Sequence, residues 1–166
     1  MYECMEDILG EVDGGCVLVV KDTQGRTFGA FINEGLREQK TYYGDGTWSV
    51  LFSYQLVNSV LMLILSGSFL WKATPFPASD FRVGHSVKSY KWTGLNEYYI
   101  LTDSRSISVG GGDGRFGLWI DGVFEKGYSS RCPCFGNEPL VDWERGRGIE
   151  EAQFEVLQFE VWAVGL

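Results

Sequence analysis

Short apolar runs separated by turn residues recur along the chain and form its clearest pattern. Residues 16–21 are a β-branched apolar run, residues 22–25 have the composition of a turn, and residues 26–31 are a second short run. Runs of this length, bounded by Gly, Asp and Asn, are typical of β-strands. The pattern therefore predicts a hairpin in this region.

The second half of the chain repeats this rhythm, and a regular succession of short strands and turns is typical of sandwiches and barrels. Residues 34–40 predict only a brief helical turn, and no segment repeats at a fixed interval. The fold class predicted for the single domain 1–166 is mainly β, an antiparallel two-sheet β-sandwich with a few short helices. The further predicted strands are residues 97–102, 106–109, 116–120, 123–126 and 154–164.

Two stretches depart from the rhythm. Residues 56–70 are mostly apolar, and no charged residue occurs from Trp48 to Trp71. A membrane-spanning helix needs about 20 predominantly apolar residues, and this run is shorter and lacks a clear positive flank. We therefore expect no membrane insertion and rank a membrane anchor last among the alternatives. The Thr-Pro-Phe-Pro sequence at residues 74–77 predicts a break, followed by a polar loop that contains His85.

Charge and composition narrow the function classes. The chain has 22 acidic and 14 basic residues, a net charge of −8, and no dense basic stripe. A polyanionic phosphate backbone would be repelled, so nucleic acid is not an expected ligand. The first residues lack the basic and apolar regions of a secretory signal, which favours an intracellular, reducing setting for the four cysteines.

Residues 112–117 match the Gly-x-Gly-x-x-Gly pattern of dinucleotide-binding loops. That pattern requires a following helix whose N-terminus holds the pyrophosphate, but the residues after Gly117 predict a strand and a turn. We interpret these glycines as tight-turn residues and expect no cofactor.

Cys132 and Cys134 are one residue apart in a predicted loop, where an exposed thiolate is open to oxidation or to a soft metal. Cys4 and Cys16 do not supply a second Cys-x-x-Cys pair, and His85 is the one imidazole of the chain. The ligand spacing therefore excludes a zinc site, and no Gly-x-Ser-x-Gly elbow predicts a hydrolase. A redox-sensitive thiol stays open as an alternative.

Aromatic residues of the predicted strands and their flanks are first of all core material, although together they would also serve as a ligand platform. We predict a core position for most of them. They are Trp92, Tyr98, Tyr99, Trp119 and Trp162.

An ordered series of motifs from about Gly15 to Val164 resembles the TLDc domain, and most closely the oxidation resistance proteins of fungi. Structural roles in the resemblance fall on Gly110, Gly111, Gly112, Gly114, Trp92, Gly94 and Trp162. The motifs are Gly-Cys-Val-Leu-Val-Val-Lys-Asp at 15–22, Tyr-Gly-Asp-Gly at 43–46, Phe-Leu-Trp at 69–71, Tyr-Lys-Trp-Thr-Gly at 90–94, the glycine-rich run 106–114, and Leu-Gln-Phe-Glu-Val-Trp at 157–162.

The resemblance implies a β-sandwich edged by short helices and a function in resistance to oxidative stress. It also implies binding to subunits of the vacuolar proton-pumping ATPase, without established catalytic residues. We therefore expect a monomeric, cytoplasmic protein-interaction domain at vacuolar or endosomal membranes, with the mitochondrion as a second location. The alternative function is a thiol-based redox enzyme or sensor that uses Cys132; relatives often carry Thr where this chain has Cys134.

Two features depart from the family pattern. Family members carry a helical segment ahead of the first hairpin, so we expect this chain to begin inside the domain. Residues 48–67, which begin with Trp48 and end with Gly67, separate the Tyr-Gly-x-Gly turn from the Phe-Leu-Trp strand. Because this uncharged stretch matches nothing in the family, our hypothesis is that it is translated intron sequence.

Overall fold

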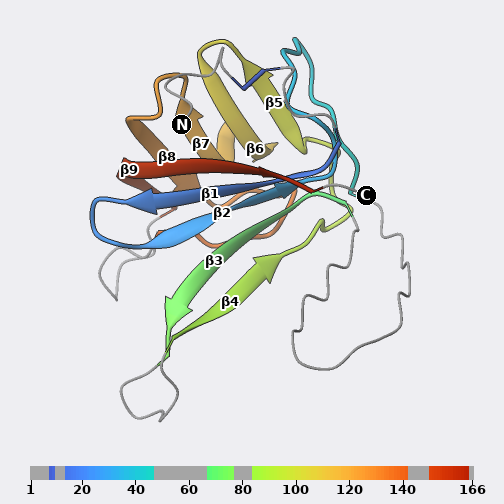
Figure 1. The fold of residues 1–166 in the computed structure, drawn as a ribbon. Helices are drawn as coiled ribbons and strands as arrows, with labels where there is room; N and C mark the ends of the chain where they lie inside the picture. Colours follow the sequence, from blue (N-terminus) through green and yellow to red (C-terminus); the bar gives the residue numbers. More distant parts are fainter. Residues whose placement is uncertain (1–7, 10–13, 47–66, 77–83, 142–149, 165–166) are drawn as a thin grey trace, which may run out of the picture.

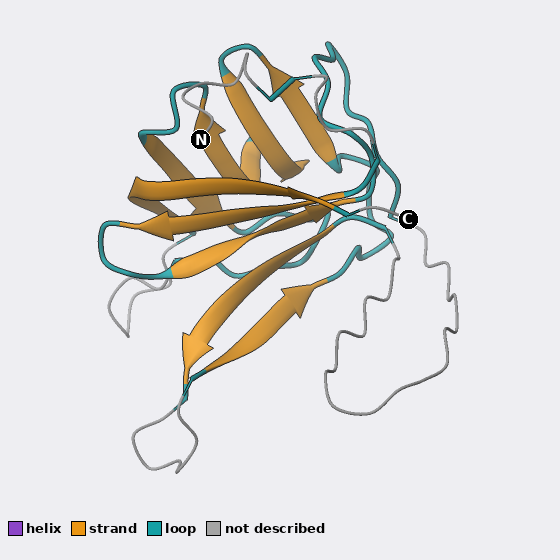
Figure 2. Ribbon diagram, in the orientation of Figure 1, coloured by secondary structure: helices purple, strands orange, loops and turns teal. Residues whose placement is uncertain are grey.

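A computed structural model describes residues 8–9, 14–46, 67–76, 84–141 and 150–164, and its regular elements are all β-strands (Figures 1 and 2). Every strand pairs antiparallel to its neighbours, so the prediction of a mainly β, antiparallel fold is confirmed. The strands are β1 (Cys16–Asp22), β2 (Thr27–Ile32), β3 (Phe69–Pro75), β4 (His85–Tyr90), β5 (Ile100–Asp103), β6 (Ser106–Gly112), β7 (Arg115–Asp121), β8 (Lys126–Ser130) and β9 (Glu151–Ala163).

The nine strands form one sheet in the order β4-β3-β2-β1-β9-β8-β7-β6-β5. The last strand is shared: residues 151–155 of β9 pair with β8, and residues 156–163 pair with β1. A register shift between Lys21 and Asp22 marks the place where β9 passes from one partner to the other. The predicted division into two separate sheets is therefore not confirmed, because β9 joins them by hydrogen bonds.

Bending of this sheet around β9 brings strands that are not neighbours into contact (Figure 1). Phe28 of β2 meets Phe154 of β9 edge to face, with ring centroids 4.8 Å apart. A methyl group placed on Gly117 of β7 would lie 2.5 Å from Leu70 Cδ1 of β3. Burial alternates along β1, where Cys16, Leu18 and Val20 belong to the buried core. The apolar face of each half thus covers the other.

The sequence predicted the β1–β2 hairpin correctly. Its turn is built around the buried carboxylate of Asp22, which accepts hydrogen bonds from the backbone N–H groups of Gln24 and Arg26 at 3.0 and 2.8 Å. Arg26 Nε donates to the second carboxylate oxygen at 2.6 Å. Gly25 has a φ of 80°, a conformation that glycine adopts without steric cost. The turn therefore satisfies its own backbone groups.

Several local predictions are wrong. Residues 34–40 contain no helical turn, and no helix occurs in the described ranges. The predicted loop after Thr74 contains β4, because β3 runs to Pro75 and His85 begins the next strand. The strand predicted at 123–126 lies instead at β8, since Phe124 has a φ of 55° and ends the turn after β7. The predicted strand 97–102 begins only at Ile100.

Most of the predicted insertion, residues 48–66, lies outside the described residues, but the chain on either side of it is described. A methyl group on Gly67 would lie 2.5 Å from Gly46 Cα, which places the two Cα atoms at most about 4 Å apart. Ser68 N–H donates to the Asp45 carbonyl at 2.8 Å. Asn33 Oδ1 accepts from Asp45 N–H and from Ser68 Oγ–H. Gly46 and Gly67 thus have the spacing of residues joined by one peptide bond.

We predict that deletion of residues 47–66, with Gly46 joined directly to Gly67, leaves the domain folded. Because a shorter loop costs less entropy to close, the free energy of unfolding should rise by up to about 2 kcal/mol. Urea denaturation followed by tryptophan fluorescence tests this against the intact chain. A deletion variant that is less stable than the intact chain contradicts the prediction.

Candidate functional site

The glycine-rich segment is the tight turn that the sequence predicted. Asp113 and Gly114 connect β6 to β7 with φ values of 55° and 74°, and β7 follows directly. Two consecutive positive φ values are typical of the hairpin turns that Asp-Gly sequences favour. A strand therefore stands where a dinucleotide fold requires a helix.

The glycines of β6 lack side chains, and this allows neighbouring residues, including the Cys-Pro-Cys loop, to pack closely against the strand. A methyl group on Gly110 would lie 2.6 Å from the Phe135 ring and 2.8 Å from Cys132 Sγ. One on Gly112 would lie 2.8 Å from Pro133 Cδ, and one on Gly111 2.7 Å from the Tyr42 hydroxyl. Side chains at Gly110 and Gly112 would displace the loop, and one at Gly111 would displace Tyr42, so packing requires glycine at these three positions.

Both cysteines of this loop are buried, in contrast to the exposed thiolate that the sequence suggested. Cys132 is 3% exposed and Cys134 is fully buried. Burial raises the pKa of Cys132 to about 11 and that of Cys134 to about 12. Cys132 Sγ–H donates to Asn137 Oδ1 at 3.1 Å. At neutral pH both groups are therefore protonated thiols, and only the thiolate is a good nucleophile or metal ligand.

The Asn137 side chain anchors the loop that follows β8. Its amide nitrogen donates to the carbonyl oxygens of Ser130 and Glu138 at 2.7 and 2.9 Å. Among the residues that the structure describes, no group of three His, Cys, Asp or Glu side chains is placed to hold a metal ion. Asn137 thus accepts from the Cys132 thiol and donates to two backbone carbonyls, which is a structural arrangement of hydrogen bonds.

The Tyr-Lys-Trp-Thr-Gly motif fastens the same loop from the other side. Thr93 N–H donates to the Cys134 carbonyl at 2.9 Å, and Thr93 Oγ donates to the Pro133 carbonyl at 2.6 Å. Trp92 Nε1–H donates to the Asn96 carbonyl at 2.6 Å, and its ring packs against the core. Gly94 has a φ of 82° and supplies the turn.

Burial of the aromatic residues matches the prediction only in part. Tyr99 is 5% exposed and Trp92 packs against the core. Trp162 is 61% exposed and Tyr98 46% exposed, so the predicted core position is wrong for these two. Trp162 lies on the solvent face of β9, where its Nε1–H donates to Glu160 at 2.7 Å.

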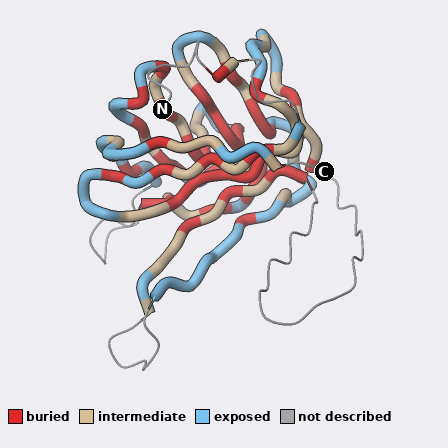
Figure 3. Tube along the Cα trace, viewed as in Figure 1, coloured by how far each residue is buried: buried red, intermediate tan, exposed pale blue. Residues whose placement is uncertain are grey.

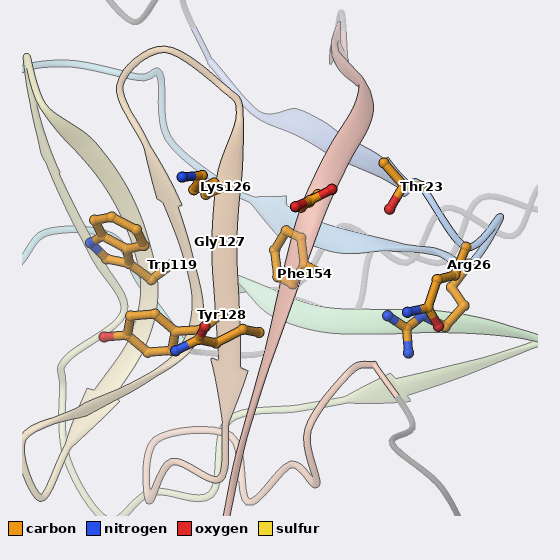
Figure 4. Close-up of a pocket in the computed structure, with 10 residues that line it drawn as sticks. Thr23, Arg26, Trp119, Lys126, Gly127, Tyr128 and Phe154 are labelled. Atoms are coloured by element: carbon orange, nitrogen blue, oxygen red, sulfur yellow. The ribbon is translucent and has the colours of Figure 1, made fainter.

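A groove on the surface lies where β7, β8 and β9 meet the β1–β2 turn, and it encloses about 670 Å³ (Figure 4). Its aromatic wall consists of Trp119 and Tyr128, which stack with centroids 5.4 Å apart and planes inclined by 17°. Charged groups at the groove are Arg26, Lys126 and Glu155. An aromatic wall with charges of both signs is suited to a peptide or protein side chain.

Sequence reasoning singled out Trp119 but not the rest of the groove. The strand pairing brings Trp119 opposite Tyr128, and Lys126 opposite Glu155. These residues come from three strands and carry no common motif, so only the register of the sheet places them together.

A carboxylate joins the β3–β4 hairpin to the loop after β8, and the sequence did not predict it. Glu138 Oε1 lies 2.8 Å from Lys88 Nζ, 2.7 Å from the Tyr90 hydroxyl and 3.1 Å from Lys72 Nζ. Lys72 is only 3% exposed, so its ammonium group requires this partner. Hydrogen bonds from Lys88 and Tyr90, with Lys72, lower the pKa of Glu138 to about 2. The sequence did contain one sign of this ion pair: Lys72 lies within the mostly apolar strand at residues 69–75, where a buried lysine would need a counter-charge.

We predict that Glu138→Gln lowers the stability of the domain at neutral pH. The folded pKa of Glu138, about 2, lies below its ordinary value of 4.5, so the carboxylate stabilises the fold above pH 4.5. This contribution is lost as the pH falls from 4.5 toward 2, and the difference between variant and wild type should shrink in that window. Urea midpoints measured across this range test the prediction.

The matched control is Glu97→Gln, which removes the same charge from an exposed loop position. Its difference from wild type should be small at every pH. A Glu138→Gln difference that stays constant from neutral pH to pH 2 would show that ionisation of this carboxylate does not stabilise the fold.

Within the described ranges, no helix has the length and apolar character needed to cross a membrane. Residues 56–66 of the apolar stretch lie outside these ranges, while Phe69 and Leu70 belong to β3.

Comparison with known proteins agrees with the motifs. Oxidation resistance protein 1 of Podospora anserina is 38% identical over 162 residues, which cover 91% of this chain and 45% of that protein. The Schizosaccharomyces pombe protein of the same name is 30% identical over 155 residues, 93% of this chain and 65% of that protein. The first of these relatives is thus about twice as long as the chain. The TLDc domain profile matches residues 1–68 and 65–165, and the chain belongs to the TLDc domain family.

Proposed function

We propose that this chain is a non-catalytic protein-interaction domain that acts in protection against oxidative damage. Relatives named Oxidation resistance protein 1 align with about nine tenths of it. Because the first of these relatives are about twice as long as the chain, the protective role is a proposal for this chain.

Burial of Cys132 is the observation that carries the non-catalytic part of the proposal. A peroxide-reducing thiol must be ionised and accessible, whereas this thiol is 3% exposed with a pKa raised to about 11. Its hydrogen-bond partner is the neutral Asn137 amide, which is no general base. These features favour a structural thiol over a catalytic one.

The partner that we propose is the vacuolar proton-pumping ATPase, as the family resemblance implies. The interaction would take place in the cytoplasm at vacuolar or endosomal membranes, with the chain as a monomer and the mitochondrion as a second location. We assign the contact to the groove at Trp119 and Tyr128 (Figure 4). Half-buried aromatic residues beside charged groups are the side chains that most often dominate binding energy.

The test of this assignment is Trp119→Ala in a Schizosaccharomyces pombe strain that lacks its own oxidation resistance protein. Loss of a central aromatic contact costs about 2 kcal/mol, which is a roughly thirtyfold loss of affinity. We predict reduced co-purification of the proton-pumping ATPase and reduced survival in peroxide, relative to the wild-type chain.

The matched control is Trp162→Ala. It removes an exposed tryptophan from the end of β9, away from residues 153–155, which line the groove. It should leave co-purification and survival unchanged. Failure of the wild-type chain to restore survival would refute the protective role. Equal co-purification by the two variants would refute the groove assignment alone.

The rival function is tested by Cys132→Ser. The serine hydroxyl can donate to Asn137 as the thiol does, so the fold should be retained. We predict that purified wild-type and Cys132→Ser chains consume hydrogen peroxide equally slowly, and that both bind the proton-pumping ATPase. Peroxide consumption by the wild type that disappears in the variant would establish the thiol enzyme instead.

A further inference from the structure

We propose that the outer edge of β4 is a docking site for an extended, acidic segment of a protein partner, which adds to the sheet as a further strand. The inference rests on the proposed function in that it assumes a protein partner. It concerns a surface separate from the groove at Trp119.

The register of the β3–β4 hairpin determines which backbone groups are free to bind. Phe76 N–H donates to the Gly84 carbonyl at 3.2 Å, so the hydrogen-bonded pairs continue at every second residue from that pair. Ser86, Lys88 and Tyr90 are therefore the β4 residues whose backbone groups bond to β3. The N–H and C=O groups of the alternate residues, His85, Val87 and Ser89, point away from β3 along the outer edge.

This edge is accessible over its whole length. Residues 85–89 are exposed on both faces of the hairpin, and Val87 at their centre is 67% exposed (Figure 3). In the strand order β4 is the terminal strand, with β3 as its neighbour among the described residues. Three successive outward residues supply a ladder long enough to hold an added strand of about six residues.

β5 forms the opposite edge of the sheet, and its backbone groups, in contrast to those of β4, are bonded to another segment of the chain. Gln39 N–H donates to the Thr102 carbonyl at 2.9 Å, and Tyr43 exchanges two backbone hydrogen bonds with Ile100. The segment before β3 therefore occupies the outer edge of β5. Natural proteins protect edge strands with proline, bulges or charged side chains. β4 has no proline and no register shift, and its one lysine, Lys88, is paired with Glu138.

The hairpin is also held in place. Lys88 and Tyr90 of β4 and Lys72 of β3 share one oxygen of Glu138. A strand that is already ordered loses less entropy when a partner binds, which favours this edge as a template.

Charge complementarity selects an acidic occupant. Lys88 is the one lysine of β4, and its side chain is 56% exposed. Residues 84–96 contain His85, two lysines and no acidic residue, in a chain whose net charge is −8. A partner strand with acidic side chains on the Lys88 face would be attracted.

A second copy of this chain fits the edge less well. Antiparallel pairing of two β4 strands about Val87 would make the two Lys88 side chains diagonal neighbours on one face of the sheet. Like charges at such positions are destabilising. An acidic strand with an apolar residue opposite Val87 avoids this repulsion.

The experiment uses the purified chain and a fluorescein-labelled octapeptide that alternates valine and glutamate, so that one face matches Val87 and the other Lys88. Fluorescence anisotropy measures binding, and amide hydrogen exchange by NMR locates it. We expect binding with slowed exchange at the amides of His85, Val87 and Ser89. The same peptide with lysine in place of glutamate should bind at least tenfold more weakly.

Recognition through the backbone is tested in two ways, by changing the protein at Val87 and by modifying the peptide. Val87→Pro removes an outward N–H that β3 does not use, so the hairpin remains, and the peptide should bind about tenfold more weakly. Val87→Thr keeps the backbone and should bind as wild type does. N-methylation of alternate peptide amides, on the edge that faces β4, should abolish binding to the unmodified protein.

Equal binding of the peptide by the Val87→Pro and Val87→Thr variants would overturn the proposal, as would equal binding of the N-methylated peptide. Self-association of the chain that Val87→Pro removes would also overturn it, by making a second copy the occupant. None of these results depends on peroxide survival, so failure of the edge site and failure of the protective function are distinguishable.

Discussion

The constraint on which the fold depends is the dual pairing of β9. Its first residues complete the half of the sheet that contains β5 to β8, and its later residues complete the half that contains β1 to β4. Because one strand serves both halves, their relative orientation is set by backbone hydrogen bonds as well as by the core. The contacts of Phe28 with Phe154, and of Leu70 with Gly117, are the packing consequence.

This arrangement explains why the glycine-rich segment and Cys132, which resemble functional motifs in the sequence, have structural roles. The bend leaves little room between β6, β7 and the loop that carries Cys132, so glycine is required at positions 110 and 117. The thiol fills the remaining space and donates to Asn137. Burial raises the pKa of this thiol, which removes the property that a redox enzyme would need. The features available to a partner are consequently on the surface, in the groove and at the sheet edge.

The elements that the sequence predicted correctly are those with one buried face. In β1, Cys16, Leu18 and Val20 alternate with less buried residues, because successive side chains of a strand point to opposite faces of the sheet. In β4 five of the six residues are exposed, so its polar sequence looks like a loop even though the backbone is fully paired to β3. The exposed position of Trp162 was not predicted because residue type does not reveal which face of a strand is covered, whereas Tyr98 precedes β5, which begins at Ile100 and not at residue 97. The groove was beyond prediction for a related reason, since it depends on cross-strand register between β7, β8 and β9.

Glu138 connects the compensation of a buried charge with the position of an exposed strand. Burying Lys72 within an apolar strand costs free energy unless a counter-charge is close, and the carboxylate that supplies it comes from the loop after β8. The same oxygen binds Lys88 and Tyr90, so the compensation of a buried charge also fixes the position of the exposed strand. Lys88 thereby lies on an open backbone edge, in a segment, residues 84–96, that contains no acidic residue. In a chain of net charge −8, a segment with two lysines and no acidic residue would repel an acidic strand less than the average surface does, so the contacts of Glu138 bear on the proposed recognition as well as on stability.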